Sequence, residues 1–147
     1  MKKIKHLLVL VAALAPLSLA AQTGLAVNRV FQGLVVPQKQ MVEVKVKGRA
    51  LSEYRLNFYH SVRFTATKPQ KATIDALVAA DRRSSAKGTE ERKKGRNAST
   101  ILTLPQRGKT NRFLCYLTKQ KGRAVVTTLA YMEGSVSNID ELRRLIE

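Results

Sequence analysis

Three strand-like segments follow one another closely in the C-terminal half of the chain, and they constrain its fold more than any other feature. Residues 99–105 (STILTLP), 112–118 (RFLCYLT) and 123–132 (RAVVTTLAYM) are rich in β-branched and apolar residues. The segments QRGKT and KQKG separate them, and each has the length and the Gly of a hairpin turn. The pattern predicts a three-stranded antiparallel meander.

Two segments in the N-terminal half predict further strands. Residues 41–47 (MVEVKVK) alternate Val with charged residues, which is the period of a strand with one face in water. The spacing of apolar residues in 54–66 (YRLNFYHSVRFTA) fits a strand and also a helix. We choose a strand because the end of this segment has poor helix propensity.

Two longer helices are predicted beside these strands. The segment QKATIDALVAADRRS carries an apolar stripe, which predicts a helix over residues 70–83. Residues 138–147 open with Asn138 and Glu141 at the spacing of a capping box. A short helix is also compatible with the apolar spacing near residues 27–34. The expected fold class is α+β: a mostly antiparallel sheet of about five strands, with a central helix and a C-terminal helix on one face.

The first residues of the chain have the pattern of a secretory signal peptide. In MKKIKHLLVLVAALAPLSLAAQ, three lysines precede an apolar run over residues 7–15, and the small residues Ser18 and Ala20 suit a cleavage site. We predict a signal peptide over residues 1–20 and a single α+β domain over 21–147, with cleavage after Ala21 as the alternative.

A membrane anchor is the weaker interpretation of the same residues. A spanning helix needs roughly 20 consecutive apolar residues. The stretch over residues 7–21 has 15 residues and is interrupted by Pro16 and Ser18. The expected location is therefore the periplasm or the extracellular space, with no transmembrane anchor after processing.

The charge of the chain points to anionic partners. It has 27 Lys and Arg against 10 Asp and Glu, a formal net charge of +17. Loss of the predicted leader would leave 24 basic and 10 acidic residues, a net charge of +14. Such an excess favours association with anions. Because the expected location lies outside the cytoplasm, we expect no nucleic acid; the candidate partners are an anionic glycan, lipopolysaccharide or an acidic envelope protein.

Basic residues gather in the segment from Arg82 to Ala98 and in the turn from Lys119 to Arg123. In an antiparallel meander these two segments should emerge at one end of the sheet. Arg107, Lys109 and Arg112 belong to the opposite end, roughly 20 Å away. The first segment also fits a solvated, flexible loop without a ligand. The candidate anion-binding residues are Arg82, Arg83, Lys87, Arg92, Lys93, Lys94, Arg96, Lys119, Lys121 and Arg123.

Few residues are available for catalysis or metal binding. Outside the leader the chain has one His, His60, and one Cys, Cys115, too few for a structural zinc site of Cys and His ligands, and we predict no cofactor. Cys115 lies in the apolar run FLCYL and is expected to be buried. His60 is expected to be a hydrogen-bonded or surface residue. Glu133 is either a catalytic candidate or an ordinary strand-end carboxylate paired with a Lys or Arg.

Several phrases of the sequence resemble a known family. The leader MKKIKHLL, the segment KGRALSEYRLNFYHSVRFTA, the stretch NRFLCYL and the ending YMEGSVSNIDELRRLI are together similar to a family of small exported proteins from Bacteroides-type bacteria, classified as a domain of unknown function. The resemblance runs over nearly the whole chain. It implies a bacterial envelope or secreted location, and it assigns no activity and no functional residue.

Two functions are compatible with these observations. The first is a noncatalytic exported envelope protein that binds an anionic surface or partner through a basic end of the sheet. The alternative is an unrecognised periplasmic hydrolase with a carboxylate or Ser-Lys site. A pocket that joins Glu133 to a second buried carboxyl group, or a buried Lys beside a Ser, would favour the hydrolase.

Overall fold

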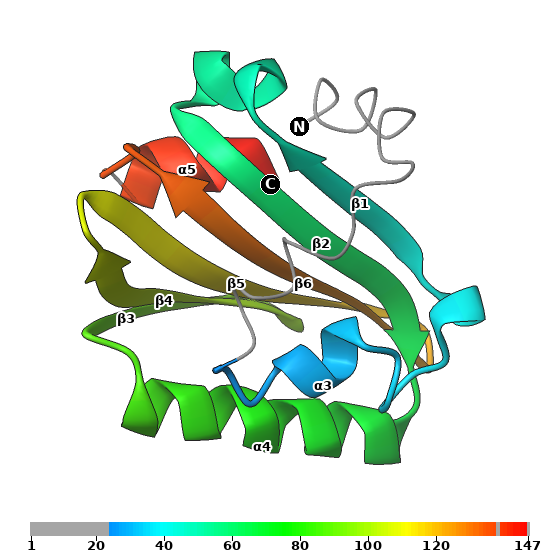
Figure 1. The fold of residues 1–147 in the computed structure, drawn as a ribbon. Coiled ribbons are helices and arrows are strands. Elements are labelled where there is room, and N and C mark those ends of the chain that lie inside the picture. The colour runs from blue at the N-terminus through cyan, green and yellow to red at the C-terminus, as the bar shows by residue number, and fades with distance from the viewer. Residues whose placement is uncertain (1–23, 138, 147) are drawn as a thin grey trace.

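A six-stranded antiparallel sheet forms the centre of the computed structural model, which describes residues 24–137 and 139–146 (Figure 1). The predicted signal peptide and Asn138 lie outside the described residues. The strands run in the order β1-β2-β6-β5-β4-β3 across the sheet. Their bounds are β1 Val42–Lys47, β2 Leu56–Ala66, β3 Gly88–Lys94, β4 Asn97–Arg107, β5 Thr110–Lys121 and β6 Ala124–Gly134.

Within the described residues, three α-helices and two short 3-10 helices accompany the sheet. They are α3 Asn28–Phe31, η3 Gln38–Gln40, η4 Arg49–Tyr54, α4 Lys68–Ser84 and α5 Ile139–Ile146. The α+β class and the antiparallel meander β4-β5-β6 are as predicted. The meander turns at Gly108 and Gly122, where φ is 62° at both residues, a backbone conformation that Gly adopts readily.

The sheet has one strand more than the five or so that we expected. Residues 88–94 form β3, an edge strand that pairs with β4 from Gly88 opposite Thr103 to Lys94 opposite Asn97, where we predicted a loop. This strand buries no apolar side chain, so its sequence GTEERKK lacks the alternation that marks a strand. The charged side chains suit an exposed edge, because they discourage pairing with a further chain.

The two long helices pack on opposite faces of the sheet, whereas we expected them on one face. Ile74 and Val78 of α4 join a core cluster with Leu114 of β5. Leu142 of α5 joins a second cluster with Cys115, the next residue of the same strand. Neighbouring side chains of a strand point to opposite faces, so an apolar run such as FLCYL requires cover on both sides.

The helix α4 begins with a capping box. The side chain of Thr67 accepts a hydrogen bond from the backbone N–H of Gln70 at 3.2 Å, and the Gln70 side chain accepts from the backbone N–H of Thr67 at 3.0 Å. These contacts satisfy two of the N–H groups that a helix start leaves without partners. The helix therefore starts directly after β2.

Near its other end, α4 holds the N-terminal segment of the described chain. The carboxylate of Asp81, which is buried, accepts hydrogen bonds from the backbone N–H groups of Ala26 at 2.7 Å and Val27 at 3.0 Å. The short helix α3 follows and places Phe31 in the core cluster under α4. One carboxylate thus joins two parts of the chain that lie far apart in sequence.

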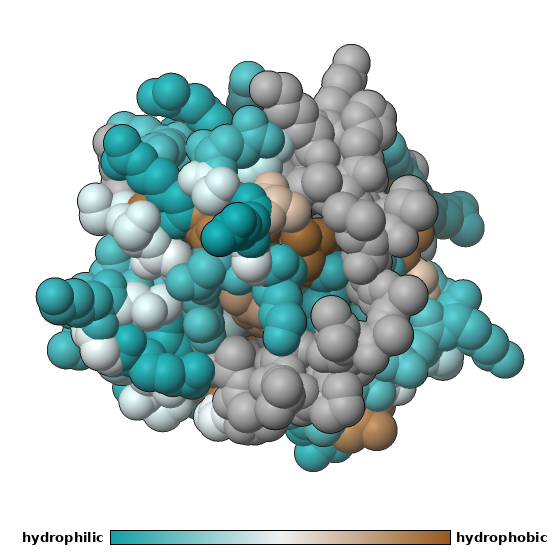
Figure 2. All heavy atoms as spheres, turned by 45° about the horizontal axis from the view of Figure 1, so that its top comes forward, coloured by the Kyte–Doolittle hydropathy of each residue, from teal (hydrophilic) through white to brown (hydrophobic). Residues whose placement is uncertain are grey.

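Hydrophilic residues dominate the coloured surface in Figure 2. Among the described residues, the large apolar side chains that are exposed are Leu34 and Val42, at 63% and 58%. No helix within residues 24–137 and 139–146 has the length and apolar character needed to cross a membrane.

Candidate functional site

The β3–β4 turn and the β5–β6 turn lie at the same end of the sheet. Lys94 pairs with Asn97, and the Asn97 side chain accepts a hydrogen bond from the backbone N–H of Gln120 at 3.3 Å. Lys121 then pairs with Ala124 across the second turn. Six exposed basic residues meet here, and we call them the cationic end: Lys93, Lys94, Arg96, Lys119, Lys121 and Arg123.

The other four candidate residues lie elsewhere. Arg82 and Arg83 belong to the last turn of α4, which runs away from the cationic end, and the backbone N–H of Lys87 bonds to Thr103. The seven residues of β3 separate Lys87 from the β3–β4 turn by roughly 20 Å. Arg92 is close in sequence, but its guanidinium contacts Glu90 at 3.2 Å. The predicted cluster is divided because its middle is a strand and not a loop.

Acidic residues are segregated from the cationic end by the register of the sheet. One continuous row of paired residues crosses all six strands. It consists of Glu91, Thr100, Tyr116, Leu129, Val62 and Glu43. Beyond this row, towards the two turns, no described strand or turn residue is Asp or Glu. The charge separation along the strands is therefore a property of the fold.

The basic side chains of the cationic end lack ion pairs with the part of the chain that the structure describes. None of its six side chains forms a salt bridge with another residue of the described chain. Elsewhere, Arg82 pairs with Glu91 at 2.5 Å and Arg107 with Glu133 at 3.6 Å. Charges within a Debye length of about 8 Å add their potentials. The positive potential of this end is thus not compensated locally.

A cleft of about 220 Å³ opens beside the cationic end, between α4 and the face of the sheet that α4 covers. Side chains of α4 form one wall, and residues of β4 and β5 form the floor. Its lining residues are Lys71, Asp75, Glu91, Arg92, Lys93, Ala98, Ser99, Thr100, Tyr116 and Thr118.

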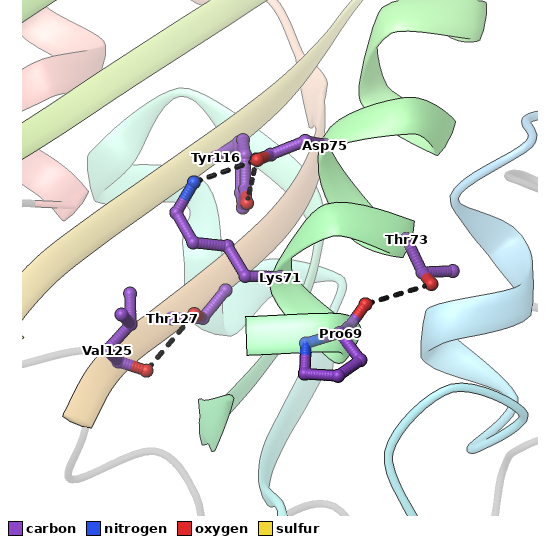
Figure 3. Close-up of polar contacts among 7 residues, drawn as sticks. All are labelled: Pro69, Lys71, Thr73, Asp75, Tyr116, Val125 and Thr127. Atoms are coloured by element: carbon purple, nitrogen blue, oxygen red, sulfur yellow. Dashed lines mark hydrogen bonds and ion pairs between the residues drawn. The ribbon is translucent and has the colours of Figure 1, made fainter. Parts of the chain in front are cut away.

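A hydrogen-bonded trio fixes the inner wall of the cleft. Figure 3 shows Lys71 and Tyr116 converging on the carboxylate of Asp75. The Tyr116 hydroxyl donates to Asp75 at 2.6 Å, and the Lys71 Nζ donates to the other carboxylate oxygen at 2.8 Å. Burial, together with the bond to Asp75, raises the pKa of Tyr116 well above its ordinary value. The phenol therefore stays protonated and acts as a hydrogen-bond donor, not as a base.

The outer wall of the cleft carries one cation without a salt bridge in the described chain. Glu91 is bound by Arg82, and Arg92 contacts Glu90. Lys93, the third charged residue of β3 in the lining, has no such pair. Lys93 belongs both to the cleft and to the cationic end, so the two surfaces are continuous.

His60 is buried within the sheet and hydrogen-bonded, as one of our two interpretations expected. Its Nε2 lies 2.5 Å from the Glu43 carboxylate, and its ring lies 4.7 Å from that of Phe31. Burial lowers the pKa of His60, and the bond to Glu43 opposes this effect only in part. The bond to His60 lowers the pKa of Glu43. A neutral imidazole that donates to a carboxylate accounts for both directions.

Glu133 is an ion-paired carboxylate at the end of a strand, as the second interpretation of that residue expected. It accepts a hydrogen bond from the Tyr131 hydroxyl at 2.5 Å and lies 3.6 Å from Arg107. Arg112 donates to the same hydroxyl at 2.8 Å. Glu133 does not line the cleft described above.

Ser99 and Lys71 both line the cleft, but each is hydrogen-bonded to another residue and not to the other. Ser99 accepts a hydrogen bond from Arg143 at 3.1 Å, while Lys71 donates to Asp75. Within residues 24–137 and 139–146, no group of three or more His, Cys, Asp and Glu could hold a metal ion. Cys115 is fully buried, as predicted from its apolar neighbours.

Comparison with known proteins identifies a family. The family described as "Family of unknown function (DUF6108)" matches residues 14–146. The chain belongs to this family. No curated protein and no solved structure matches it. DUF6108 membership agrees with the resemblance to a domain of unknown function and assigns no role to any residue.

Within this DUF6108 chain, sequence reasoning missed the cleft. Lys71 and Asp75 are four residues apart on a predicted helix, so their pairing was readable from spacing. Tyr116 lies in an apolar run, which predicts a buried core residue and no polar role. Nothing in the sequence indicated that α4 would cross β5 at this residue, because side-chain contacts between distant elements leave no periodic signal.

Proposed function

We propose that this protein is a noncatalytic exported protein of the bacterial envelope that binds an anionic surface or partner through its cationic end. The supporting observation is the convergence of six exposed basic side chains, without salt bridges among the described residues, on the part of the sheet that has no acidic residue. Such an arrangement costs electrostatic repulsion in the free protein. A bound anion relieves that cost.

An anionic polymer suits this surface better than a small ion. The six basic residues come from β3, the end of β5 and two turns, so they are spread over neighbouring strands about 4.8 Å apart. A single small anion would contact few of them. A glycan with repeated acidic groups, lipopolysaccharide phosphates or an acidic envelope protein would contact several at once.

The compartment in this proposal comes from the leader pattern in residues 1–20. Outside the cytoplasm, nucleic acids are not expected as partners. Export is tested by intact-mass measurement of the native protein after cell fractionation. We expect an envelope or extracellular species that lacks residues 1–20 or 1–21. Recovery of the full-length chain from the cytoplasm would contradict the proposed location.

Binding is tested with heparin as a model polyanion and with two variants that lose the same formal charge. The first replaces four exposed basic residues of the cationic end by Gln: Lys94, Arg96, Lys121 and Arg123. The control replaces four exposed basic residues that lie elsewhere: Lys47, Arg83, Lys87 and Lys109. We expect the first variant to bind heparin at least about tenfold more weakly than the control at low salt. Equal losses in the two variants would contradict the proposal.

The hydrolase alternative has less support. Glu133 is engaged by Tyr131 and Arg107 and does not line the cleft. In the cleft, both carboxylate oxygens of Asp75 are engaged, one by a phenol and the other by an ammonium group. A protonated Tyr116 offers no nucleophile. The contacts of the cleft favour binding over bond cleavage.

A further inference from the structure

The cleft beside the cationic end provides the elements of a binding site for one sugar unit. We infer that it binds a monosaccharide residue that carries a single anionic group, such as a sugar acid or a sugar phosphate. This inference rests on the proposed function, because the sugar would be one unit of the anionic polymer that the cationic end holds. The cleft would add selection by shape to the cationic end, which by itself distinguishes ligands only by their charge.

The size of the cleft limits its ligand. Its volume of about 220 Å³ is below the range of roughly 300–1,000 Å³ that is usual for drug-sized ligands. A single sugar ring with a small substituent fits such a space. Tyr116 is buried, with 8% of the residue exposed, so it presents no open face on which a nucleobase could stack.

The polar groups of the cleft match the hydroxyl groups of a sugar. A sugar hydroxyl both donates and accepts hydrogen bonds, so it needs donors and acceptors placed side by side. Asp75 supplies an acceptor fixed by Tyr116, and Lys71 supplies an ammonium group with three donors, one of which is used by Asp75. Thr100 and Thr118 add hydroxyl groups on the floor. Because the trio is already ordered, a ligand meets a largely prepared site.

The charges of the cleft select an anionic sugar over a neutral one. The carboxylates of Asp75 and Glu91 are each paired with a basic residue. Lys93 remains as a cation without a salt bridge in the described chain, and it stands where the cleft meets the cationic end. A carboxylate or phosphate of the ligand would bind there with a charge-assisted hydrogen bond. The hydroxyl groups of the ring would then face Asp75 and Lys71.

The inference is tested by calorimetric titration at physiological ionic strength with glucuronate, glucose 6-phosphate, glucose and inorganic phosphate. We expect saturable binding of glucuronate or of glucose 6-phosphate, and at least about tenfold weaker binding of glucose and of phosphate. Stronger binding of glucuronate would indicate a carboxylate as the natural anionic group, and stronger binding of glucose 6-phosphate would indicate a phosphate. Equal binding of glucose, or equal binding of phosphate, would overturn the inference.

Variants of two neighbouring lysines distinguish binding in the cleft from attraction to the overall charge of the cationic end. Lys93 lines the cleft, whereas Lys94 follows it in β3 and therefore points to the opposite face of the sheet. Lys93→Gln should weaken glucuronate binding about tenfold, and Lys94→Gln should change it less than twofold. The two variants should show a similar decrease in retention on heparin. Equal effects of the two variants on glucuronate would overturn the inference.

A second variant tests the floor of the cleft without a change of charge. Thr100→Val keeps the side-chain shape and removes a hydroxyl group, and we expect it to weaken sugar binding severalfold while heparin retention is unchanged. Absence of any sugar binding, together with normal heparin retention, would overturn the cleft inference and leave the proposed function standing. Equal heparin retention by the cationic-end variant and its control of equal charge would instead contradict the proposed function itself.

Discussion

At the scale of single residues, Gly134 is the glycine of the strands with the least room for a side chain. A Cβ at this residue would lie 2.2 Å from the carbonyl oxygen of Arg55 and 2.6 Å from the Cα of Leu56. The same carbonyl accepts hydrogen bonds from the backbone N–H groups of Ser135 at 2.9 Å and Val136 at 3.1 Å. Only a residue without a side chain allows this close approach at the end of β6.

Gly134→Ala should therefore destabilise the protein by about 2 kcal/mol or more, because backbone atoms must move to admit the methyl group. Gly88→Ala is the matched control, since its Cβ would meet nothing closer than Thr103 at 3.9 Å. We expect that control to change stability by less than about 0.5 kcal/mol. Urea denaturation measures both; similar losses would show that the contact with Arg55 is not decisive.

The buried histidine predicts a pH dependence of stability. Burial lowers the pKa of His60 in the folded protein below its ordinary value of 6.5, so the unfolded chain binds more protons once the pH falls to that range. The free energy of unfolding should thus decrease as pH drops through 6.5, by at most about 1.4 kcal/mol per pH unit. Above that range the contribution is fully present. Glu43, whose pKa is also lowered, adds a further loss below 4.5.

His60→Gln should flatten the stability curve between pH 7.5 and 5.5, since an amide does not titrate and can still donate to Glu43. No other His lies outside the predicted leader, so other side chains contribute little in this range. Urea denaturation at a series of pH values measures the effect. Parallel curves for the variant and the parent would show that His60 is not the group responsible.

At the scale of elements, one carboxylate fixes the N-terminal segment to α4. Asp81→Ala would leave the N–H groups of Ala26 and Val27 without their acceptor, at a cost of about 1–3 kcal/mol for each buried donor. Asp81→Asn keeps one acceptor oxygen and should lose less. Hydrogen exchange should show faster exchange of residues 25–31 in both variants, with β4 to β6 little affected. Uniform acceleration across the sheet would contradict a local anchor.

Much of this arrangement of elements could be predicted from sequence, and the failures have physical causes. The strands β1, β2, β4, β5 and β6 and the helices α4 and α5 each bury apolar residues with a regular period, which is visible in the chain. The edge strand β3 buries none, so only its pairing with β4 defines it. The faces chosen by α4 and α5 depend on chain paths between elements, which apolar periodicity does not encode.

The candidate site likewise has a part that could be predicted from the sequence and a part that could not. The predicted meander alone placed five of the basic residues together, because the end of the predicted loop and one predicted turn lie at the same end of the sheet. These residues are Lys94, Arg96, Lys119, Lys121 and Arg123. Arg82, Arg83 and Lys87 were assigned to the same end because the extent of β3 was not recognised. The cleft combines α4 with three strands, and that contact forms only in the folded chain.

At the scale of the whole molecule, the main feature is the uneven distribution of charge along the sheet. Like charges within the cationic end repel one another most at low ionic strength, and salt screens them. The melting temperature should rise by about 4 °C as salt is increased from roughly 10 to 150 mM. The cationic-end variant used with heparin should show a smaller rise than its control of equal charge. Equal rises would indicate that only net charge matters.

The cationic end also determines how the molecule would be oriented on an anionic surface. On a negatively charged wall, the β3–β4 and β5–β6 turns would face the wall, and the β4–β5 turn would face the solution. Neighbouring copies would adopt the same orientation, because the wall attracts each of them by the same end. A partner that arrives from solution would then meet the β4–β5 turn and the surroundings of Gly134 first.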